Sequence, residues 1–559
     1  MKRGIAMMKS AKIWIFLLIM VVLLLPGCGK KDAEQKTDAE TKTIRIIGTS
    51  DTHGKFVPWD YALNEEDTSG SMAQIATAVK EYRNDNTLLI DVGDTIQDNS
   101  ADLFLESDDV HPMIQAINAI GYDAWVAGNH EFNYGMDVVR KTIADTECET
   151  LCGNVWDENG DPISDSYHIF EVDGVRVAVI GMVTGNITTW DKTNLEKCTV
   201  KDPQDETRKI IKEIEGQYDV LIGAFHMGFD NELGLENSGV TDILNDCPEF
   251  DLMISSHEHQ AIDGEDVNGV LVVQNEEMAK TMAVIDLTLE KDGDGWKVAD
   301  KSSKCVEMSD YEPDPELVSK LDKYDKMARA HALEEIGRLD GGDLAPSYKG
   351  EGVPPARTED TALIDLILAA QMHYSGAKVS AAALFDDDTN MTPGPILKCE
   401  TAKIYKFSNT LYTLRMTGAQ LKKYMEWSAG YFNTYKEGDQ EVTVNPEVAG
   451  FNYDMFGGVN YEIDVSQEPG ARIKNLTWPD GTPVADDDTF EIAVNNYRAN
   501  SNLLTPGSIY EEGDMPELIA MDVRSDLGGV REIIGHYIAE VKGGVITPEC
   551  DHNWKLTGF

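Results

Sequence analysis

Hydrophobic and polar positions alternate in one repeated pattern over residues 43–298. A short apolar run rich in β-branched residues ends at a cluster of Asp, His, Asn or Gly, and a stretch with helical spacing often follows. The runs with strand character span 44–48, 88–90, 123–127, 220–225 and 252–254, and helical spacing occurs over 72–82, 111–120 and 208–214. Strands that alternate with helices in this way predict a layered α/β domain.

The polar clusters at the ends of these runs contain residue types that bind metals. Five of the eleven His residues stand there, together with two Asp and one Asn: His53, His130, His226, His257, His259, Asp51, Asp94 and Asn129. Ligands in open α/β sheets bind where the strands end. Because so many such groups at corresponding positions are hard to attribute to packing, we expect them to form one functional cluster.

Mixed imidazole and carboxylate ligands favour zinc, manganese, iron or nickel over calcium or magnesium. Without His130, seven candidate ligands remain, which is too many for one tetrahedral ion and suits two ions that share a bridging carboxylate. The spacing of Asp51-x-His53 and His257-x-His259 predicts that each pair lies on one side of an extended segment. Two such ions, about 4 Å apart, activate water and hold phosphate oxygens during an in-line displacement.

The loop after residues 123–127 has the sequence Gly-Asn-His-Glu-Phe-Asn-Tyr-Gly over residues 128–135. We expect Asn129 to hold a metal ion and His130 to do proton or charge work on a phosphate. The structural alternative is an ordinary turn, in which Asn and Gly supply positive φ. The other loops with metal-binding residue types favour the functional interpretation.

The N-terminus has the pattern of an export signal, because basic residues precede an apolar run over residues 13–25 that is short for a membrane-spanning helix. Cys28 follows Gly27 as in a bacterial lipobox. We therefore expect residues 1–28 to be a lipoprotein signal peptide and lipobox, with the alternative of a plain signal peptide cleaved near Gly27. Residues 29–42 have the composition of a flexible tether. The mature protein is then expected outside the cytoplasm, attached to the bacterial membrane by a lipid on Cys28.

The charge of the chain limits its partners. A formal net charge of -51 at pH 7 repels polyanions and argues against polymeric nucleic acid as a partner. A small anionic substrate then needs local cations, which metal ions supply. The eight Cys residues show no paired Cys-x-x-Cys spacing and predict neither a zinc knuckle nor a disulfide framework, although Cys148 and Cys152 can bond if a turn brings them together.

The pattern changes after residue 310. Residues 312–336 predict a long helix, either a connection between domains or a surface helix with an apolar stripe, and residues 337–357 are rich in loop formers. A second domain follows, with helices predicted over 361–373 and 418–427 and a strand over 378–385. It carries aromatic residues beside amides over 405–411, 451–454 and 494–498. Most of these rings are expected in the core, but a pair of rings can also sandwich a nucleotide base.

The order Asp-x-His, Gly-Asp, Gly-Asn-His-Glu, His and His-x-His resembles the calcineurin-like metallophosphoesterases. Over essentially the whole mature chain, the sequence is similar to the secreted 5'-nucleotidases and 2',3'-cyclic-nucleotide 2'-phosphodiesterases. The resemblance implies an α-β-β-α sandwich over residues 43–310, a linking helix and loop over 311–345, and an α/β (α+β) nucleotide-binding domain over 346–559. It also implies two divalent metal ions and a nucleotide or cyclic-nucleotide substrate.

The resemblance assigns a role to each candidate residue. One ion would be held by Asp51, His53, Asp94 and His259, and the other by Asp94, Asn129, His226 and His257, with Asp94 as the bridge. His130 would face the phosphate and assist the leaving group. Phe407 and Tyr497 match positions at which the family stacks the base, whereas Asn409 and Asp454 are expected to contact ribose and base.

Ser256 replaces the usual Gly before His-x-His, a modest change that crowds the loop without removing a ligand. Two departures from the 5'-nucleotidase pattern bear on the substrate. Asn133 stands where 5'-nucleotidases often have an Asp that pairs with the catalytic His. An Asn cannot stabilise an imidazolium by charge. A Gly-Gly-Arg phosphate segment is also missing, and residues 381–385 stand in that region. We therefore expect a 2',3'-cyclic-nucleotide 2'-phosphodiesterase/3'-nucleotidase. The alternatives are a 5'-nucleotidase or UDP-sugar hydrolase, and a non-catalytic lipid-anchored nucleotide-binding surface protein.

Overall fold

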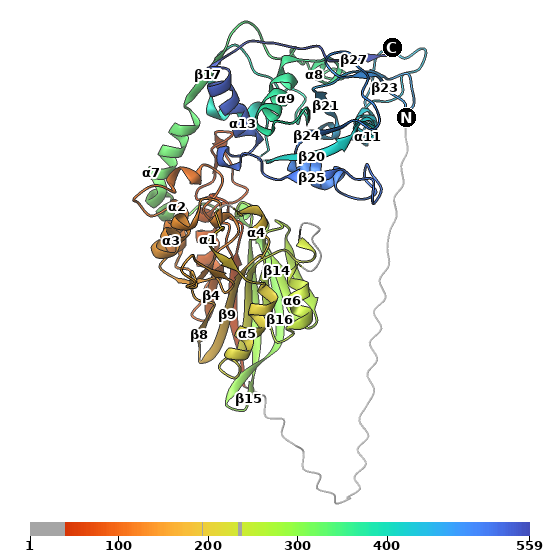
Figure 1. Cartoon of the computed structure of the whole chain (residues 1–559). Helices are drawn as coiled ribbons and strands as arrows, with labels where there is room; N and C mark the ends of the chain where they lie inside the picture. The colour runs from red at the N-terminus through yellow and green to blue at the C-terminus, as the bar shows by residue number, and fades with distance from the viewer. Residues whose placement is uncertain (1–39, 193, 233–237, 408) are drawn as a thin grey trace, which may run out of the picture. The chain divides into compact units, whose positions relative to one another are not determined.

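The computed structural model describes residues 40–192, 194–232, 238–407 and 409–559 (Figure 1). The expected signal peptide, the lipid attachment at Cys28 and most of the expected tether lie outside these residues. The first strand, β1 (Thr41–Thr49), begins inside the stretch expected as a tether. No helix among the described residues is long and apolar enough to cross a membrane.

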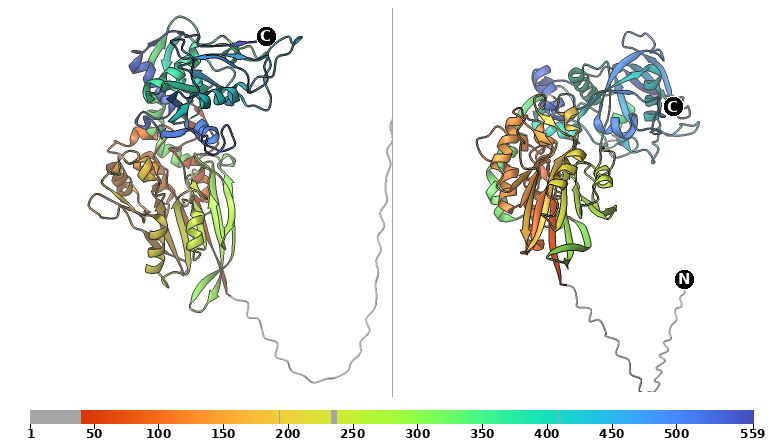
Figure 2. Two further views of the ribbon diagram at one scale, coloured as in Figure 1. Left: turned by 45° about the vertical axis from the view of Figure 1, so that its right-hand side comes forward. Right: turned by 60° about the horizontal axis from the view of Figure 1, so that its bottom comes forward.

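Two six-stranded sheets form the centre of the N-terminal domain (Figures 1 and 2). The first has the order β16 (Gly295–Glu307), β15 (Thr281–Asp292), β1, β4 (Thr87–Asp91), β5 (Ala124–Val126) and β6 (Glu149–Leu151). The second has the order β13 (Ile262–Val267), β14 (Val270–Gln274), β12 (Leu252–Ser255), β11 (Val220–His226), β9 (Val175–Val183) and β8 (Tyr167–Val172). Ile46, Ile90, Val179, Ile222 and Ile254 are fully buried in the core between the sheets.

The strands that carry the predicted site are parallel to one another within each sheet. β1 pairs with β4, β4 with β5, and β5 with β6, all in parallel. β11 likewise lies parallel to β9 and β12. Parallel neighbours end at the same edge of a sheet, so the loops after these strands collect there.

Helices cover the outer face of each sheet. Apolar residues of α1 (Met72–Tyr82), α2 (Pro112–Ile120) and α7 (Pro315–Ala332) share a core with the first sheet. Those of α5 (Pro203–Glu213) and α6 (Val240–Asp246) share a core with the second. The expected α-β-β-α sandwich is therefore confirmed. The helix expected over 312–336 is shorter than predicted, because it begins after the N-cap Asp314 and β17 (Glu335–Leu339) follows it.

The C-terminal domain is also α/β. Its main sheet has the order β21 (Asp454–Gly457), β18 (Val379–Ala383), β24 (Thr489–Asn495), β20 (Leu411–Thr417) and β25 (Glu517–Ala520). Apolar residues of α9 (Ala362–Ser375), α11 (Gly418–Ala429) and α13 (Val530–His536) share one core with this sheet. Two three-stranded sheets complete the domain: β19 (Gly394–Leu397), β17 and β26 (Val545–Ile546), and β23 (Ile473–Thr477), β22 (Asn460–Asp464) and β27 (Trp554–Thr557).

The cysteines of the described chain are free thiols. Cys148 and Cys152 therefore form no disulfide in this structure. Burial raises the pKa of both thiols to about 12, which keeps them neutral at physiological pH. Both behave as small apolar residues rather than as nucleophiles.

Glu131 joins the loops that follow β4 and β5. Its buried carboxylate accepts hydrogen bonds at 2.7–3.3 Å from four backbone N–H groups, which belong to Asp94, Thr95, Ile96 and Gly128. The two loops approach so closely that a Cβ on Gly93 would lie 2.3 Å from the backbone N of Gly128. The carboxylate thus fixes one loop relative to the other, and both loops carry predicted site residues.

We expect Glu131→Gln to lower the thermal stability of the N-terminal domain. The amide NH₂ group would face two of the four backbone donors, and each buried donor left without an acceptor costs about 1–3 kcal/mol. Such a loss lowers the unfolding midpoint by roughly 5–20 °C in a domain of this size, as measured by scanning calorimetry. The control, Glu147→Gln at an exposed position, should shift the midpoint by no more than about 2 °C. Equal midpoints for the two variants would contradict the assigned role of the carboxylate.

Candidate dimetal site

The predicted metal ligands converge at the edge where β1, β4, β5, β11 and β12 end. Their ligand atoms form two groups, each with members within 4.8 Å of one another: Asp51, His53, Asp94 and His259 in one group, and Asp94, His226 and His257 in the other. Asn129 joins the second group, because its Oδ1 lies 3.0 Å from Nε2 of His226. Asp94 belongs to both groups. This grouping is the one that the sequence resemblance implies.

The backbone at these ligands is not extended. φ is positive at five of them: 51° at Asp51, 42° at His53, 53° at Asp94, 75° at His257 and 59° at His259. The prediction that Asp51 and His53, and likewise His257 and His259, point to one side of an extended segment is therefore wrong. Left-handed backbone turns the side chains of each pair toward the cluster instead, at a cost of about 1–3 kcal/mol per residue. Strain of this size is typical of functional sites.

The tautomer of His226 is fixed by the backbone. Its Nδ1 lies 2.6 Å from the carbonyl oxygen of Val92, which only accepts hydrogen bonds, so Nδ1 carries the proton. In the neutral ring, Nε2 then presents a lone pair to two oxygens, Oδ2 of Asp94 at 3.1 Å and Oδ1 of Asn129 at 3.0 Å. Three electron-rich atoms at such distances need a cation among them, either a proton or a metal ion.

His53 and His259 repeat this arrangement. Nδ1 of His53 lies 3.0 Å from Oδ2 of Asp98, and Nδ1 of His259 lies 3.2 Å from Oε2 of Glu277. Their Nε2 atoms face each other at 3.1 Å, where two lone pairs would repel without a cation between them. Asp98 and Glu277 were missed by the sequence analysis, because nothing in the sequence connects them to their His partners.

The charges around Asp94 favour a cation site. Burial alone would raise the pKa of Asp94, but His226, His130 and His53 hold it well below its usual range. Burial lowers the pKa of His226, yet Asp94 and the other oxygens outweigh this and raise it to about 10. Oδ2 of Asp94 and Nε2 of His257 are buried and make no hydrogen bond to the described part of the chain. Such a donor set fits two divalent metal ions.

Ser256 and Trp190 flank His257. The Ser256 hydroxyl is buried and donates a hydrogen bond to the carbonyl oxygen of Phe225 at 3.3 Å, so the loop accommodates a side chain where a Gly was expected. The Trp190 ring, at the end of α4 (Ile187–Trp190), stacks on the His257 ring with centroids 5.1 Å apart. This contact packs against one face of the imidazole, and sequence spacing gave no sign of it.

His130 lies beside the ligand cluster and is partly open to solvent. Its Nε2 is 3.9 Å from Oδ2 of Asp94, and its backbone N–H donates to Oδ1 of the same residue at 2.9 Å. Its Nδ1 lies 2.6 Å from Oδ1 of Asn133. Asn133 therefore pairs with His130, as an Asp does in the 5'-nucleotidase pattern. Nε2 remains directed toward the site, where a substrate phosphate ester would lie.

Two predicted base-stacking residues of the C-terminal domain are exposed. Phe407 is 49% exposed and Tyr497 is 47% exposed, whereas most aromatic rings of the domain are buried. The segments that carry them are joined through Tyr405, whose hydroxyl lies 3.0 Å from Nδ2 of Asn495 and 3.4 Å from Nδ2 of Asn409. Asn409 thus lies in the connection between these segments. Two exposed rings on adjoining segments are suited to holding a base.

Asp454 has a different environment from the one expected. Its carboxylate is buried, accepts a hydrogen bond from the Tyr424 hydroxyl at 2.6 Å and pairs with Nε of Arg498 at 2.6 Å. Arg498 also donates from Nη2 to the carbonyl oxygen of Phe451 at 2.6 Å. In this structure Asp454 supports the segments next to Tyr497 and Phe451, and a direct contact with substrate stays a prediction.

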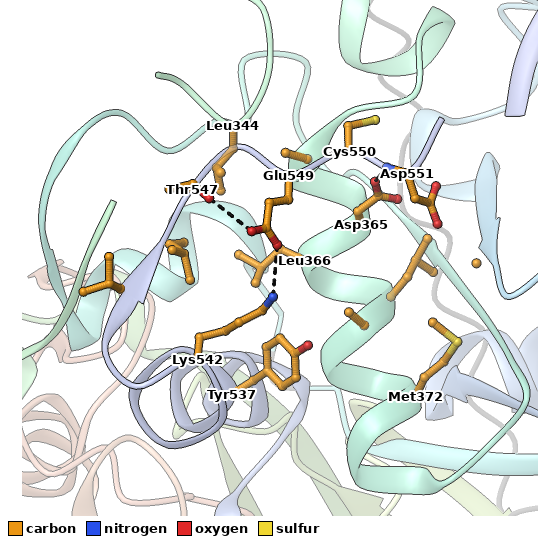
Figure 3. A pocket seen from close by; sticks show the side chains of 16 residues that line it. Leu344, Asp365, Leu366, Met372, Tyr537, Lys542, Thr547, Glu549, Cys550 and Asp551 are labelled. Atoms are coloured by element: carbon orange, nitrogen blue, oxygen red, sulfur yellow. Dashed lines mark hydrogen bonds and ion pairs between the residues drawn. The ribbon is translucent and has the colours of Figure 1, made fainter. Parts of the chain in front are cut away.

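The C-terminal domain also contains a cavity of about 300 Å³ (Figure 3). Its lining includes Leu366 and Met372 from α9, and a hydrogen bond of 3.2 Å joins Lys542 to Glu549 at its side. Neither Phe407 nor Tyr497 lines it. The cavity is therefore distinct from the base-binding surface that the sequence predicts.

Comparisons with known proteins agree with this geometry. Residues 44–261 match the calcineurin-like phosphoesterases, and residues 336–504 match the C-terminal domain of 5'-nucleotidases. The chain is 29% identical to the 2',3'-cyclic-nucleotide 2'-phosphodiesterase/3'-nucleotidase of Salmonella typhimurium over 93% of this chain and 89% of that protein. It is 28% identical to the trifunctional nucleotide phosphoesterase YfkN of Bacillus subtilis over 96% of this chain, but spans only 40% of YfkN.

A solved structure shows the same fold. A protein of Staphylococcus aureus provisionally described as a 5'-nucleotidase superposes with a TM-score of 0.65 and 23% identity, over 92% of this chain and 100% of that one. The likeness extends over both domains. The chain therefore joins a calcineurin-like phosphoesterase domain, from a family that uses two divalent metal ions, to a 5'-nucleotidase C-terminal domain.

Proposed function

We propose that the protein is an extracytoplasmic 2',3'-cyclic-nucleotide 2'-phosphodiesterase and 3'-nucleotidase. The observation that carries the proposal is the pairing of His130 with Asn133 at a 2.6 Å contact beside the complete ligand cluster. The Asn distinguishes this site from the Asp pattern of 5'-nucleotidases. The relative from Salmonella typhimurium, which carries this name, aligns over 93% of the chain.

Each residue of the site has a role in the proposed reaction. Asp51, His53, Asp94 and His259 would hold one ion, and Asp94, Asn129, His226 and His257 the other. When bound, the two ions supply Lewis acidity to phosphate oxygens and lower the pKa of an attacking water. Water adds to phosphorus, the bond from phosphorus to the ribose 2' oxygen breaks, and His130 donates the proton that this oxygen takes up. Phe407 and Tyr497 hold the base.

The two alternative functions, a 5'-nucleotidase or UDP-sugar hydrolase and a non-catalytic binding protein, are supported by different observations. A 5'-nucleotidase of Vibrio cholerae is 27% identical over 43% of this chain, which keeps 5'-nucleotides as the second candidate substrate class. A non-catalytic binding protein has no need for a full ligand set, yet every predicted ligand lies in the cluster. We therefore prefer a hydrolase over a surface protein that only binds nucleotides.

We also propose that the protein is exported and attached to the membrane by a lipid on Cys28. The support is the sequence alone: the basic and apolar segments before Leu25-Pro26-Gly27-Cys28. A membrane anchor would place the nucleotidase at the cell surface, where it meets nucleotides from outside the cell.

Substrate preference is measured directly by product release from 2',3'-cyclic AMP, 3'-AMP, 5'-AMP and UDP-glucose, each with added Mn²⁺. We expect kcat/KM for 2',3'-cyclic AMP and 3'-AMP to exceed the values for 5'-AMP and UDP-glucose. The pairing of His130 with a neutral amide is the structural reason for this order. A higher kcat/KM for 5'-AMP or UDP-glucose would replace the proposal with the second candidate.

We expect Phe407→Ala and Tyr497→Ala to raise the KM for 2',3'-cyclic AMP by about 5- to 100-fold, because stacking contributes about 1–3 kcal/mol per base. Ribose 2,3-cyclic phosphate has no base, so its KM should not change. Phe559→Ala removes another exposed ring, 67% exposed, from the same domain and serves as the matched control. Equal effects on the substrates with and without a base would remove these two residues from the base site.

A further inference from the structure

We propose that Asp191 is a positioning residue for His130 and acts through the carboxamide of Asn133. The proposal rests on the proposed function of His130 as the proton donor to the leaving oxygen. Asp191 follows α4 and lies 61 positions after His130 in the sequence. The motif over residues 128–135 therefore contains Asn133 but gives no sign of the carboxylate behind it.

The three side chains form a hydrogen-bonded chain. Nδ1 of His130 lies 2.6 Å from Oδ1 of Asn133, and Nδ2 of Asn133 donates to Oδ1 of Asp191 at 3.0 Å. Asp191 is 6% exposed, so water competes little for its carboxylate. Burial raises the pKa of Asp191, whereas the hydrogen bond from Asn133 opposes that rise. The carboxylate thus faces the NH₂ end of the amide.

This chain fixes the orientation of the amide. An ionised carboxylate has acceptors only, so Asp191 selects the NH₂ end of Asn133. The carbonyl end of Asn133 must then face His130, and because it also only accepts, Nδ1 of His130 must carry the proton. The neutral ring therefore keeps its lone pair on Nε2, which takes up a proton and later gives it to the leaving oxygen.

Packing alone does not account for a carboxylate at this position. Oδ2 of Asp191 is buried and makes no hydrogen bond within the described ranges, which is a cost that a purely structural residue would avoid. The loop has a further support in Asn194, whose Nδ2 donates to the carbonyl oxygens of Phe132 at 3.0 Å and Asn133 at 2.7 Å, and lies at a longer 3.5 Å from Oδ1 of Asp191. Asn194 thus holds the backbone, whereas Asp191 orients the amide.

In the 5'-nucleotidase pattern a carboxylate contacts the catalytic His directly. Here the Asp191 carboxylate lies one side chain further from His130 and orients the His130 ring through the Asn133 amide. An amide passes on geometry and tautomer but little charge. Loss of Asp191 should therefore matter most where the leaving oxygen needs a proton.

The test compares two phosphodiesters in the metal-loaded, full-length enzyme. In 2',3'-cyclic AMP the leaving group is a ribose alkoxide, which needs protonation, whereas bis(p-nitrophenyl) phosphate releases a stable phenolate. We expect Asp191→Asn to lower kcat for 2',3'-cyclic AMP by about 10- to 100-fold, part of the 10²–10⁴-fold that general acid catalysis contributes. KM should stay within about twofold, and kcat for the aryl ester should fall by less than about threefold.

A carboxylate swap supplies the rescue. In the double variant Asp191→Asn and Asn133→Asp, the new carboxylate contacts Nδ1 of His130 directly and the Asn at 191 donates to it. We expect this double variant to recover most of the kcat for 2',3'-cyclic AMP. Asn133→Asp alone places two carboxylates side by side and should not improve on the wild type. Asn194→Ala, the control for loop structure, removes the two short hydrogen bonds to the backbone and only one long contact to Asp191, so it should affect both phosphodiesters equally.

A spectroscopic measurement separates this inference from the substrate assignment. Nitrogen NMR of ¹⁵N-His-labelled protein should show the His130 ring with its proton on Nδ1 in the wild type and a mixture of tautomers in Asp191→Asn. If the wild type hydrolyses 5'-AMP instead of cyclic nucleotides, the proposed substrate fails while the tautomer and the leaving-group dependence still test Asp191. Equal losses on both phosphodiesters, no rescue by the swap, or an unchanged tautomer would overturn the inference.

Discussion

Four hydrogen bonds to one buried carboxylate hold the catalytic edge of this protein together. Glu131 accepts from the backbone of the loop after β4 and from that of the loop after β5. The first loop carries Asp94, which belongs to both ligand groups, and the second carries Asn129 and His130. The position of Asp94 relative to His130 thus depends on Glu131, which is itself not a candidate ligand.

A second regularity concerns the imidazoles around the site. Nδ1 of each of four rings faces an acceptor outside the ligand cluster: the Val92 carbonyl for His226, Asp98 for His53, Glu277 for His259 and Asn133 for His130. Where Nδ1 carries the proton, Nε2 is left with its lone pair and points inward. In the proposed reaction, the same device prepares three rings for metal binding and one for proton transfer. The roles differ because Nε2 would face a metal ion in three rings and the leaving oxygen of the substrate in His130.

The residues of the site could be predicted from the sequence, whereas the geometry that joins them could not. Apolar runs that end in Asp, His and Asn indicated the strand ends correctly, since parallel strands end at one edge. The left-handed backbone at Asp51 and His257 was not predictable, because local spacing describes an extended chain unless a turn residue such as Gly appears. Asp98, Asp191 and Glu277 were missed for another reason: their partners are set by tertiary packing. Asp454 likewise forms an ion pair with Arg498, a residue 44 positions away, so nothing in the sequence indicated this contact.

The central claim is that the cluster holds two divalent ions bridged by Asp94. Anomalous diffraction at the manganese absorption edge, from crystals of the protein grown with Mn²⁺, tests it most directly. We expect two peaks, one beside His53 and His259 and the other beside His226 and His257, with Asp94 in contact with both. A single peak at this edge of the sandwich, or two peaks that do not share Asp94, would contradict the claim.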